Sequence, residues 1–385
     1  MRISASAAAV LVLGGSMVLT TPTASANESC DQPLGVAGQY NEFIETDATR
    51  TPDSEGAVAV GGDAEFTGGF SIGSHLPSTD ALPGNAALVV GGTLATGSKH
   101  YTVLEKGSAV YGKLSGRAVE VKPQSPARTA AQGGSPVDFA GEFGKLRSLS
   151  AALAKEAARG TTALKADGGD TTLTLTGTDA KINTFSVTAG QLQGAKHITF
   201  DVPQGSSSVV NVSGTAYDMN AAGTYAIDGP SELQGHLLWN FPEATKVTKK
   251  SDMSWPGSVL APGAAVDLGT GGPLEGTVIA KSLTAVGSAE THHFPFSGCL
   301  PRSAPPAEDN EQAPPPSSAP PAPEDSAAAP QPSPMGSESP APAEDDLAST
   351  GGGAALPIAG TAAAVLAAGT AFLIVSRRRR ATAQR

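Results

Sequence analysis

Carboxylates are the groups in this sequence that could do chemistry on a polysaccharide, because hydrolases and lyases bring two or three of them into one cleft. Here the acidic residues of the central region stand far apart, and many lie beside turn residues, which indicates solvated or turn-forming roles. They include Asp63, Asp138, Asp179, Asp201, Asp218 and Asp267. The sequence also contains no H-E-x-x-H helix or phosphate-binding loop. We therefore predict no catalytic residues and no enzyme activity.

Two other sets of side chains could bind a ligand. His292–His293 could supply metal ligands, but no third ligand stands at a recognisable spacing, so we expect no metal and no cofactor. Thr172, Thr174 and Thr176 alternate, which places three hydroxyls on one face of a strand. Such a row could bind ice or a carbohydrate surface. One strand is not a ladder, however, and a solvent-facing strand is the favoured interpretation.

The only two cysteines, Cys30 and Cys299, stand at the edges of the central region, 269 positions apart (299 − 30). In an exported protein such a pair predicts a disulfide that clamps the first and last segments together. Closing so long a loop would stabilise the fold by about 5 kcal/mol on the chain-entropy model. Two free thiols or an intermolecular bond are the alternatives.

Short runs of Val, Leu and Ala end repeatedly in glycine turns and predict the strands that position these groups. The runs recur about every 20–30 residues, which favours a parallel β-solenoid over an antiparallel sandwich, whose strands recur about every 8–12 residues. Few aromatics and 46 glycines suit a narrow interior. The predicted strands lie at 57–62, 88–92, 109–112, 208–212, 236–241, 257–261 and 276–280.

One segment has helical periodicity instead. Ser135-Pro136-Val137-Asp138 is typical of a helix start, with Ser135 as the N-cap and proline at the first helical position. Gly160 is a plausible stop, which gives a helix of about 23 residues. We expect its apolar stripe to pack along the solenoid. The stripe consists of Phe139, Phe143, Leu146, Leu149 and Leu153.

The formal net charge of −11 is distributed unevenly, with +1 in residues 1–26, −9 in 27–300, −8 in 301–350 and +5 in 351–385. An acidic central region cannot neutralise phosphates. Nucleic acids and anionic lipid surfaces are therefore excluded as partners of the folded part.

The N-terminus addresses the chain for export. Residues 1–26 combine a basic start at Arg2, a short apolar run and small residues before a cleavage site between Ala26 and Asn27, which is typical of a secretory signal peptide. An uncleaved anchor helix is the alternative. We therefore predict a secreted central region.

The C-terminal part divides into a stalk, a membrane span and a tail. Residues 301–346 hold 14 of the 30 prolines, from Pro301 to Pro342, and little apolar bulk, so we predict a disordered stalk that reaches up to roughly 140 Å. Residues 354–375 are apolar and long enough for a transmembrane helix. The basic residues of 376–385 predict a cytoplasmic tail.

The pentapeptide before the span is Leu347-Ala348-Ser349-Thr350-Gly351. Pentapeptide, span and basic tail together resemble the cell-wall sorting signal of Gram-positive bacteria, in an L-A-x-T-G variant of L-P-x-T-G associated with actinobacterial sortases. The resemblance implies that a sortase cuts between Thr350 and Gly351 and joins Thr350 to a peptidoglycan precursor. The alternative is a permanent transmembrane anchor.

The central region carries a second resemblance. Its segments include 34–43, 55–63, 88–92, 211–214, 239–244, 257–262 and 276–283. In this order they are similar to the choice-of-anchor A domain, which implies that residues 27–300 form a β-helix-like adhesin domain without catalytic residues. We accordingly expect a cell-wall adhesin that binds an unknown extracellular protein or glycan. A wall-attached glycan-active β-helix enzyme and a structural coat component are the alternatives.

Thr350→Ala should abolish covalent attachment to the wall, because the scissile threonine carbonyl would no longer fit the sortase. The expected result is loss of the protein from muramidase-released wall material and its appearance in membrane and medium fractions. Ser349→Ala, at the variable position of the motif, is the matched control. Unchanged wall-linked protein in the Thr350 variant would refute the sorting assignment.

Overall fold

The computed structural model describes residues 28–122 and 129–301, which belong to one compact unit. The predicted signal peptide with its cleavage site, the stalk beyond residue 301, the sorting motif, the transmembrane segment and the basic tail lie outside the described residues. Within the described ranges, no helix has the length and hydropathy needed to span a bilayer.

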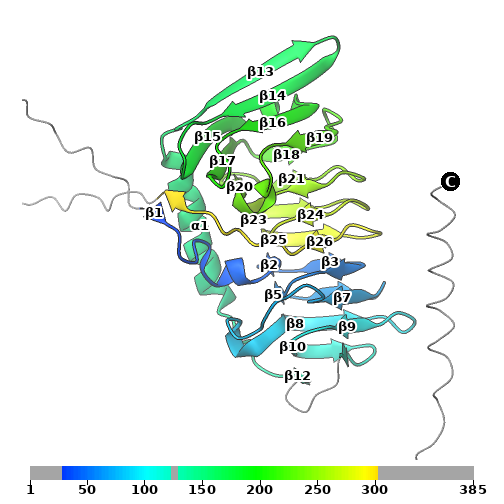
Figure 1. The fold of residues 1–385 in the computed structure, drawn as a ribbon. Helices are drawn as coiled ribbons and strands as arrows, with labels where there is room; N and C mark the ends of the chain where they lie inside the picture. Colours follow the sequence, from blue (N-terminus) through cyan, green and yellow to red (C-terminus); the bar gives the residue numbers. More distant parts are fainter. Residues whose placement is uncertain (1–27, 123–128, 302–385) are drawn as a thin grey trace, which may run out of the picture. The chain divides into compact units, whose positions relative to one another are not determined.

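The described chain is mainly β and winds into coils whose strands lie on three faces (Figure 1). The first face contains β2 (Glu42–Ile44), β5 (Val58–Val60), β8 (Ala86–Thr96), β10 (Ser108–Ser115), β12 (Ala130–Gln132), β15 (Ile182–Thr188), β17 (Ser207–Ser213), β20 (Leu237–Asn240), β23 (Ser258–Asp267) and β25 (Val278–Ala285). The second face contains the C-terminal halves of β8, β10, β23 and β25 together with β3 (Ala48–Arg50), β6 (Ala64–Phe66), β18 (Ala216–Asp218) and β21 (Lys246–Thr248).

The third face is made of two separate sheets. One contains β4 (Asp53–Ser54), β7 (Phe70–Ile72), β9 (Thr102–Leu104), β11 (Glu120–Val121), β22 (Trp255–Pro256), β24 (Leu274–Glu275) and β26 (Thr291–His292). The other contains β13 (Thr161–Asp167), β14 (Asp170–Thr176), β16 (His197–Asp201) and β19 (Ala226–Asp228). The remaining elements are β1 (Glu28–Ser29), β27 (Leu300–Pro301), α1 (Phe139–Lys155), α2 (Ala189–Gln193), α3 (Leu233–His236) and the short 3-10 helices at Gly35–Gln39 and Pro83–Asn85.

Successive coils pair in parallel, as β5 does with both β2 and β8. Among the described strands, only β1 with β27 and β13 with β14 pair antiparallel. The predicted mainly β character is therefore confirmed, and the strand pairing is that of stacked coils and not of an antiparallel sandwich. The seven predicted strands overlap β5, β8, β10, β17, β20, β23 and β25.

Glycines at the corner between the first and second faces explain the repeated Val-Gly-Gly pattern. A Cβ atom on Gly61 would collide with the carbonyl oxygen of Glu45 in the neighbouring coil. Gly91 stands in the same relation to Gly61, and Gly112 to Gly91. Glycine is needed here because the backbones of neighbouring coils approach closely at this corner, with no space for a side chain.

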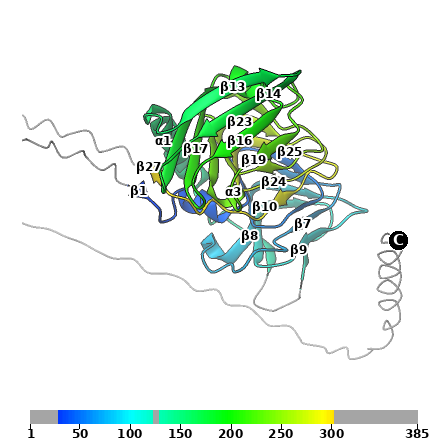
Figure 2. The same cartoon turned by 45° about the horizontal axis from the view of Figure 1, so that its top comes forward.

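The order of the coils in space differs from their order in the sequence. From β2 the chain winds through β5, β8 and β10 to β12, and α1 then runs back along the outside of the coils (Figure 1 and Figure 2). The second half winds from β15 through β17, β20 and β23 to β25. There β25 pairs with β2 and β3, and β26 pairs with β4. We call this contact between the first and last coils the seam.

A buried ion pair holds the seam together. The guanidinium of Arg50 binds both carboxylate oxygens of Glu42, at 2.7 Å from Nη2 to Oε1 and 3.0 Å from Nε to Oε2, and both side chains are 0% exposed. Arg50 also donates to the carbonyls of Ala285 and Ala289 in the last coil, each at 2.9 Å. Thr291 donates to Glu42 at 2.7 Å from the same coil. Both charges are thus fully hydrogen-bonded, as burial requires.

Two further devices fasten the halves of the chain. Cys30 and Cys299 form the predicted disulfide, with a Cα–Cα distance of 4.1 Å, and β1 pairs with β27 beside it. Helix α1 contacts both halves. Phe143 stacks on Phe43 of β2, with 5.4 Å between ring centroids, while the Ser150 carbonyl accepts from Asn240 of β20 at 2.9 Å.

The helix prediction was right about the buried stripe and wrong about the ends. Helix α1 begins after Asp138, whose side chain accepts the Gly141 N–H at 3.0 Å, because the Ser135 hydroxyl is engaged by Val137 in a local turn. The helix ends at Lys155, so it has 17 residues and stops short of Gly160. Of the predicted stripe, Phe143, Leu146 and Leu153 are buried, together with Ser150, and Phe139 and Leu149 are half-buried against the core.

Glu42→Gln should destabilise the fold strongly, because it leaves the Arg50 guanidinium buried without its counter-charge. Loss of one partner of a buried pair costs about 3–5 kcal/mol. Urea unfolding followed by fluorescence of the buried Trp239 and Trp255 measures the free energy of unfolding. Glu120→Gln is the control, since Glu120 pairs with Lys122 at the surface and such pairs contribute at most about 1 kcal/mol. Equal losses in the two variants would contradict the role of the seam pair.

Asp53→Asn should stabilise the protein more at neutral than at acidic pH. Within the described residues the buried Asp53 Oδ1 has no hydrogen-bond partner. Burial, helped by Glu290 and opposed by Arg50, raises the pKa of this carboxyl to about 6 from 3.8. The folded state thus binds the proton more tightly, and the carboxyl's contribution to the free energy of unfolding falls as pH rises from about 4 to about 6.

Urea unfolding at pH 4.5 and pH 7.5 tests this linkage. We expect the stability of the Asp53→Asn variant relative to the unaltered protein to be larger at pH 7.5. Asp80→Asn, at an exposed turn, controls for the loss of one formal charge. The same relative stability at both pH values would show that burial of the Asp53 carboxylate carries no penalty.

Candidate ligand-binding surface

The carboxylates considered in the sequence serve mainly as backbone acceptors. Asp63 accepts the Thr93 N–H at 2.6 Å and thereby links two coils. Backbone N–H groups of Lys181 and Ile182 donate to Asp179 and lower its pKa. Asp138 caps α1, Asp218 accepts from Asn220, and Asp267 accepts from Gly269. Asp201 ends β16. The structure does not bring this set together in one cleft.

The adjacent histidines of the third face have different partners. His292 Nε2 lies 3.3 Å from Glu290 Oε2, whereas His293 Nδ1 lies 2.7 Å from Asn41 Oδ1. Burial lowers the pKa of His293. Among the described residues, no group of three or more His, Cys, Asp or Glu side chains has a geometry that could hold a metal ion. The pair fastens the seam, where Asn41 also donates to the His292 carbonyl at 2.8 Å.

The alternating threonines lie on β14, and their neighbours interrupt any ladder. Thr172 stands opposite His197 of β16, Thr174 opposite Thr199, and Thr176 opposite Asp201. On the other side β14 faces β13, which contributes Lys165 and Ala163 next to Thr172 and Thr174. The outer surface of this small sheet is therefore polar and mixed, and not a regular array of hydroxyls.

A longer regular row runs along the outside of the second face and crosses the seam. Each residue stands opposite the next in the strand register, through eight coils. The row consists of Ser115, Ala95, Glu65, Thr49, Thr284, Asp267, Thr248 and Asp218. Its members are mostly short and polar or acidic, and each is exposed or half-buried. We call this surface the second-face row.

A groove opens on the third face, where two sheets part. β17 pairs with β20 on the first face and β18 with β21 on the second, but β19 and β22 of the same two coils do not pair. The space between them has a cavity volume of about 440 Å³, within the range of small-molecule sites, which is roughly 300–1,000 Å³. We call it the inter-sheet groove.

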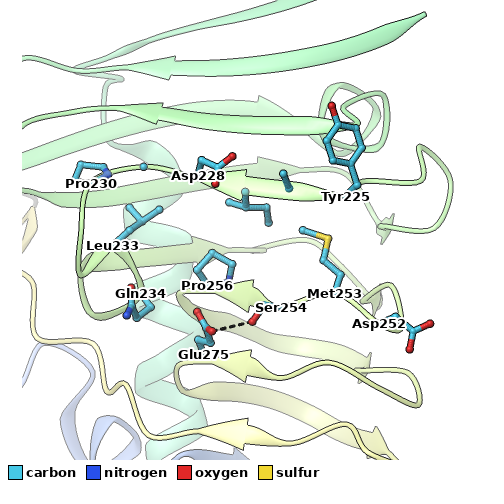
Figure 3. Close-up of a pocket in the computed structure, with 13 residues that line it drawn as sticks. Tyr225, Asp228, Pro230, Leu233, Gln234, Asp252, Met253, Ser254, Pro256 and Glu275 are labelled. Atoms are coloured by element: carbon cyan, nitrogen blue, oxygen red, sulfur yellow. Dashed lines mark hydrogen bonds between the residues drawn. The ribbon is translucent and has the colours of Figure 1, made fainter. Parts of the chain in front are cut away.

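Polar groups form the rims of the inter-sheet groove, and apolar side chains lie between them (Figure 3). Asp228 belongs to the β19 rim, while Asp252 and Ser254 belong to the opposite rim. Glu275, from the next coil, accepts the Ser254 hydroxyl at 2.8 Å. The apolar part consists of Ile227, Pro230, Leu233, Met253 and Pro256.

A fixed aromatic ring stands at one end of the groove. Tyr225 is 55% exposed, and its ring stacks on His197 at 5.9 Å between centroids with an interplanar angle of 25°. His197 is held in turn by Asp228, at 2.7 Å from Nε2 to Oδ2. The Tyr225 hydroxyl lies 3.5 Å from Asp170. The ring is therefore presented to solvent with little freedom to turn away.

Sequence reasoning missed the groove residues. They come from three separate segments, 225–234, 252–256 and 275, and none of these has a motif or a spacing that indicates a site. The one signal available was a tyrosine in a polar, glycine-containing connection of a protein with few aromatic residues.

Comparison with solved structures finds two ice-binding proteins. One, from the Antarctic ascomycete Antarctomyces psychrotrophicus, is 12% identical with a TM-score of 0.27. The other, a domain of ice-binding protein 1 of Shewanella frigidimarina, is 14% identical with a TM-score of 0.34. Each alignment covers 67% of this chain and 96% of the other. The fold assignment of this chain therefore depends on its own strand pairing and not on these two structures.

Among curated proteins, none matches. A family model described as "Putative Ice-binding-like adhesive domain" matches residues 33–293. This range begins just after Cys30, ends at His293 and includes nearly all of the coils. The match covers well over half of the chain. The protein therefore belongs to the family of ice-binding-like adhesive domains.

Proposed function

We propose that the protein is a sortase-anchored cell-wall adhesin of a Gram-positive bacterium. Its coiled head, residues 27–300, is held away from the wall by the stalk at 301–346 and binds an extracellular protein or glycan. The sorting motif at 347–351 provides covalent attachment through Thr350. The membrane is contacted through 354–375 and only before sorting.

The adhesive-domain match over residues 33–293 carries this proposal. The family is one of adhesive domains and not of enzymes, which favours a binding module over a glycan-active enzyme. The adhesive-domain family and the Cys30–Cys299 disulfide both favour a secreted or surface protein, because disulfides persist outside the cytoplasm. Sorting, sortase and peptidoglycan are supported by the sequence resemblance alone.

Electrostatics narrows the ligand class. The mature wall-linked product, residues 27–350, would carry a formal charge of −17, the sum of −9 and −8. The second-face row contributes Glu65, Asp267 and Asp218 and no basic side chain. Nucleic acids and other polyanions are poor partners for such a surface.

Display of the full chain on a sortase-positive, non-adherent host tests the adhesin function. Cells with the unaltered protein should adhere to at least one coating in a panel of matrix proteins, neutral glycans and wall polymers, and the host without the gene should not. Thr350→Ala should reduce adhesion, because the head is then no longer linked covalently to the wall. Equal adhesion with and without the gene on every coating would refute the proposal.

The coat-component alternative gives a different result in the same cells. A coat protein would cross-link cells or form ordered arrays without any added coating, whereas an adhesin leaves cells dispersed until its ligand is supplied. Sedimentation of the displaying cells in buffer, followed by addition of the soluble ligand found in the panel, separates the two outcomes.

A further inference from the structure

We propose that the inter-sheet groove is a saccharide-binding site for neutral or amino-bearing oligosaccharides. This inference rests on the proposed adhesin function and names its ligand class. Tyr225 and Asp252 lie at one end of the groove, and Pro230, Leu233 and Gln234 lie at the other (Figure 3). A chain of sugar units would follow the groove between β19 and β22.

The lining of the inter-sheet groove combines apolar and polar groups, as the surface of a sugar does. Each sugar ring presents apolar C–H faces and hydroxyls at its edges. Between the rims, the half-buried Ile227 and Pro230 can cover a C–H face, whereas Met253 and Leu233 are buried, at 7% and 6% exposed. Along the rims, the carboxylates of Asp228 and Glu275 and the amide of Gln234 can hydrogen-bond hydroxyls.

Tyr225 supplies the remaining contact. An exposed aromatic ring packs well against an apolar sugar face, and its entropy cost is low when its orientation is already fixed. Here the His197 stack and the His197–Asp228 contact at 2.7 Å fix that orientation before any ligand arrives. Asp228 also lines the groove, so the side chain that holds His197 beneath the Tyr225 ring is itself part of the β19 rim.

Charge decides which sugars fit. The ionisable residues that line the groove are Asp228, Asp252, Glu275 and the tyrosine itself, and no Lys, Arg or His is among them. Uronic acids, sialylated glycans and phosphate-bearing wall polymers would be repelled. Hydroxyls and protonated amines would be accepted, because carboxylates are hydrogen-bond acceptors when ionised.

A peptide strand fits the groove less well. Strand addition needs free backbone N–H groups along the edge that receives it. In β22, the N–H of Trp255 is donated to the Pro273 carbonyl at 2.9 Å, and Pro256 has no N–H. The groove edge formed by β22 therefore offers no backbone N–H donor to an incoming strand.

Titration of labelled tetrasaccharides onto cells that display the full chain tests the proposal. The probes are cellotetraose, a chitosan tetramer and tetragalacturonate, which are neutral, amino-bearing and acidic. Cellotetraose or the chitosan tetramer should bind, and tetragalacturonate should not. Tyr225→Ala should weaken binding by about tenfold or more, as expected for a central aromatic contact. Tyr225→Phe should stay within about twofold, because it keeps the ring.

Tyr101→Ala is the matched control. Tyr101 is 50% exposed and also packs on a neighbouring side chain, with the Arg117 guanidinium 3.9 Å from its ring centroid, but it lies outside the groove. Its removal should leave probe binding unchanged at equal surface display, measured by antibody. Equal effects of the two tyrosine variants, preferred binding of tetragalacturonate, or no binding of either other probe would each overturn the proposal.

Failure of this inference differs from failure of the adhesin function. If cells with Tyr225→Ala bind the tetrasaccharide probes and adhere in the coating panel as the unaltered cells do, the adhesin proposal stands and the groove assignment falls. If unaltered cells adhere to no coating yet bind cellotetraose or the chitosan tetramer through Tyr225, the groove is a saccharide site on a protein that is not an adhesin.

Discussion

The contact between the first and last coils is the constraint on which the rest of this fold depends. Because the chain winds outward from its first coil and later returns to it, neither half has a complete stack until β25 meets β2. The buried Arg50–Glu42 pair lies at that contact, and Arg50 also binds carbonyls of the last coil. A buried charge that is satisfied only when both coils are in place makes the seam specific, since an incorrect stacking would leave the charge without partners.

Helix α1 and the disulfide act on the same problem from outside the coils. The aromatic residues at the start of α1 pack on Phe43 of β2, in the first half of the chain. Ser150, near the end of α1, binds Asn240 of β20, in the second half. The Cys30–Cys299 bond joins the segments that flank the coils. These long-range contacts offset the large entropy cost of bringing the two halves of a long chain together.

Regular stacking and its single interruption on the third face create two different surfaces. Continuous parallel register produces the straight second-face row of small and acidic side chains. The inter-sheet groove arises where β19 and β22 part, although the other strands of the same coils remain paired. A binding function is thus compatible with a rigid scaffold, because the groove needs no moving element. Most of the scattered aspartates considered for catalysis are already engaged in turns, caps and coil links.

The sequence by itself determined the local features: the strands that end in Val-Gly-Gly corners, the buried stripe of α1 and the pair of cysteines. Each depends on neighbouring residues or on residue type, and only the ends of α1 were misplaced, because Asp138 and not Ser135 caps it. Tertiary structure alone decided that the last coil stacks on the first, and that Tyr225, Asp252 and Glu275 line one groove. Parallel pairing between distant strands is set by packing across the whole stack, and a side chain's neighbours in the next coil have no signature in its own segment.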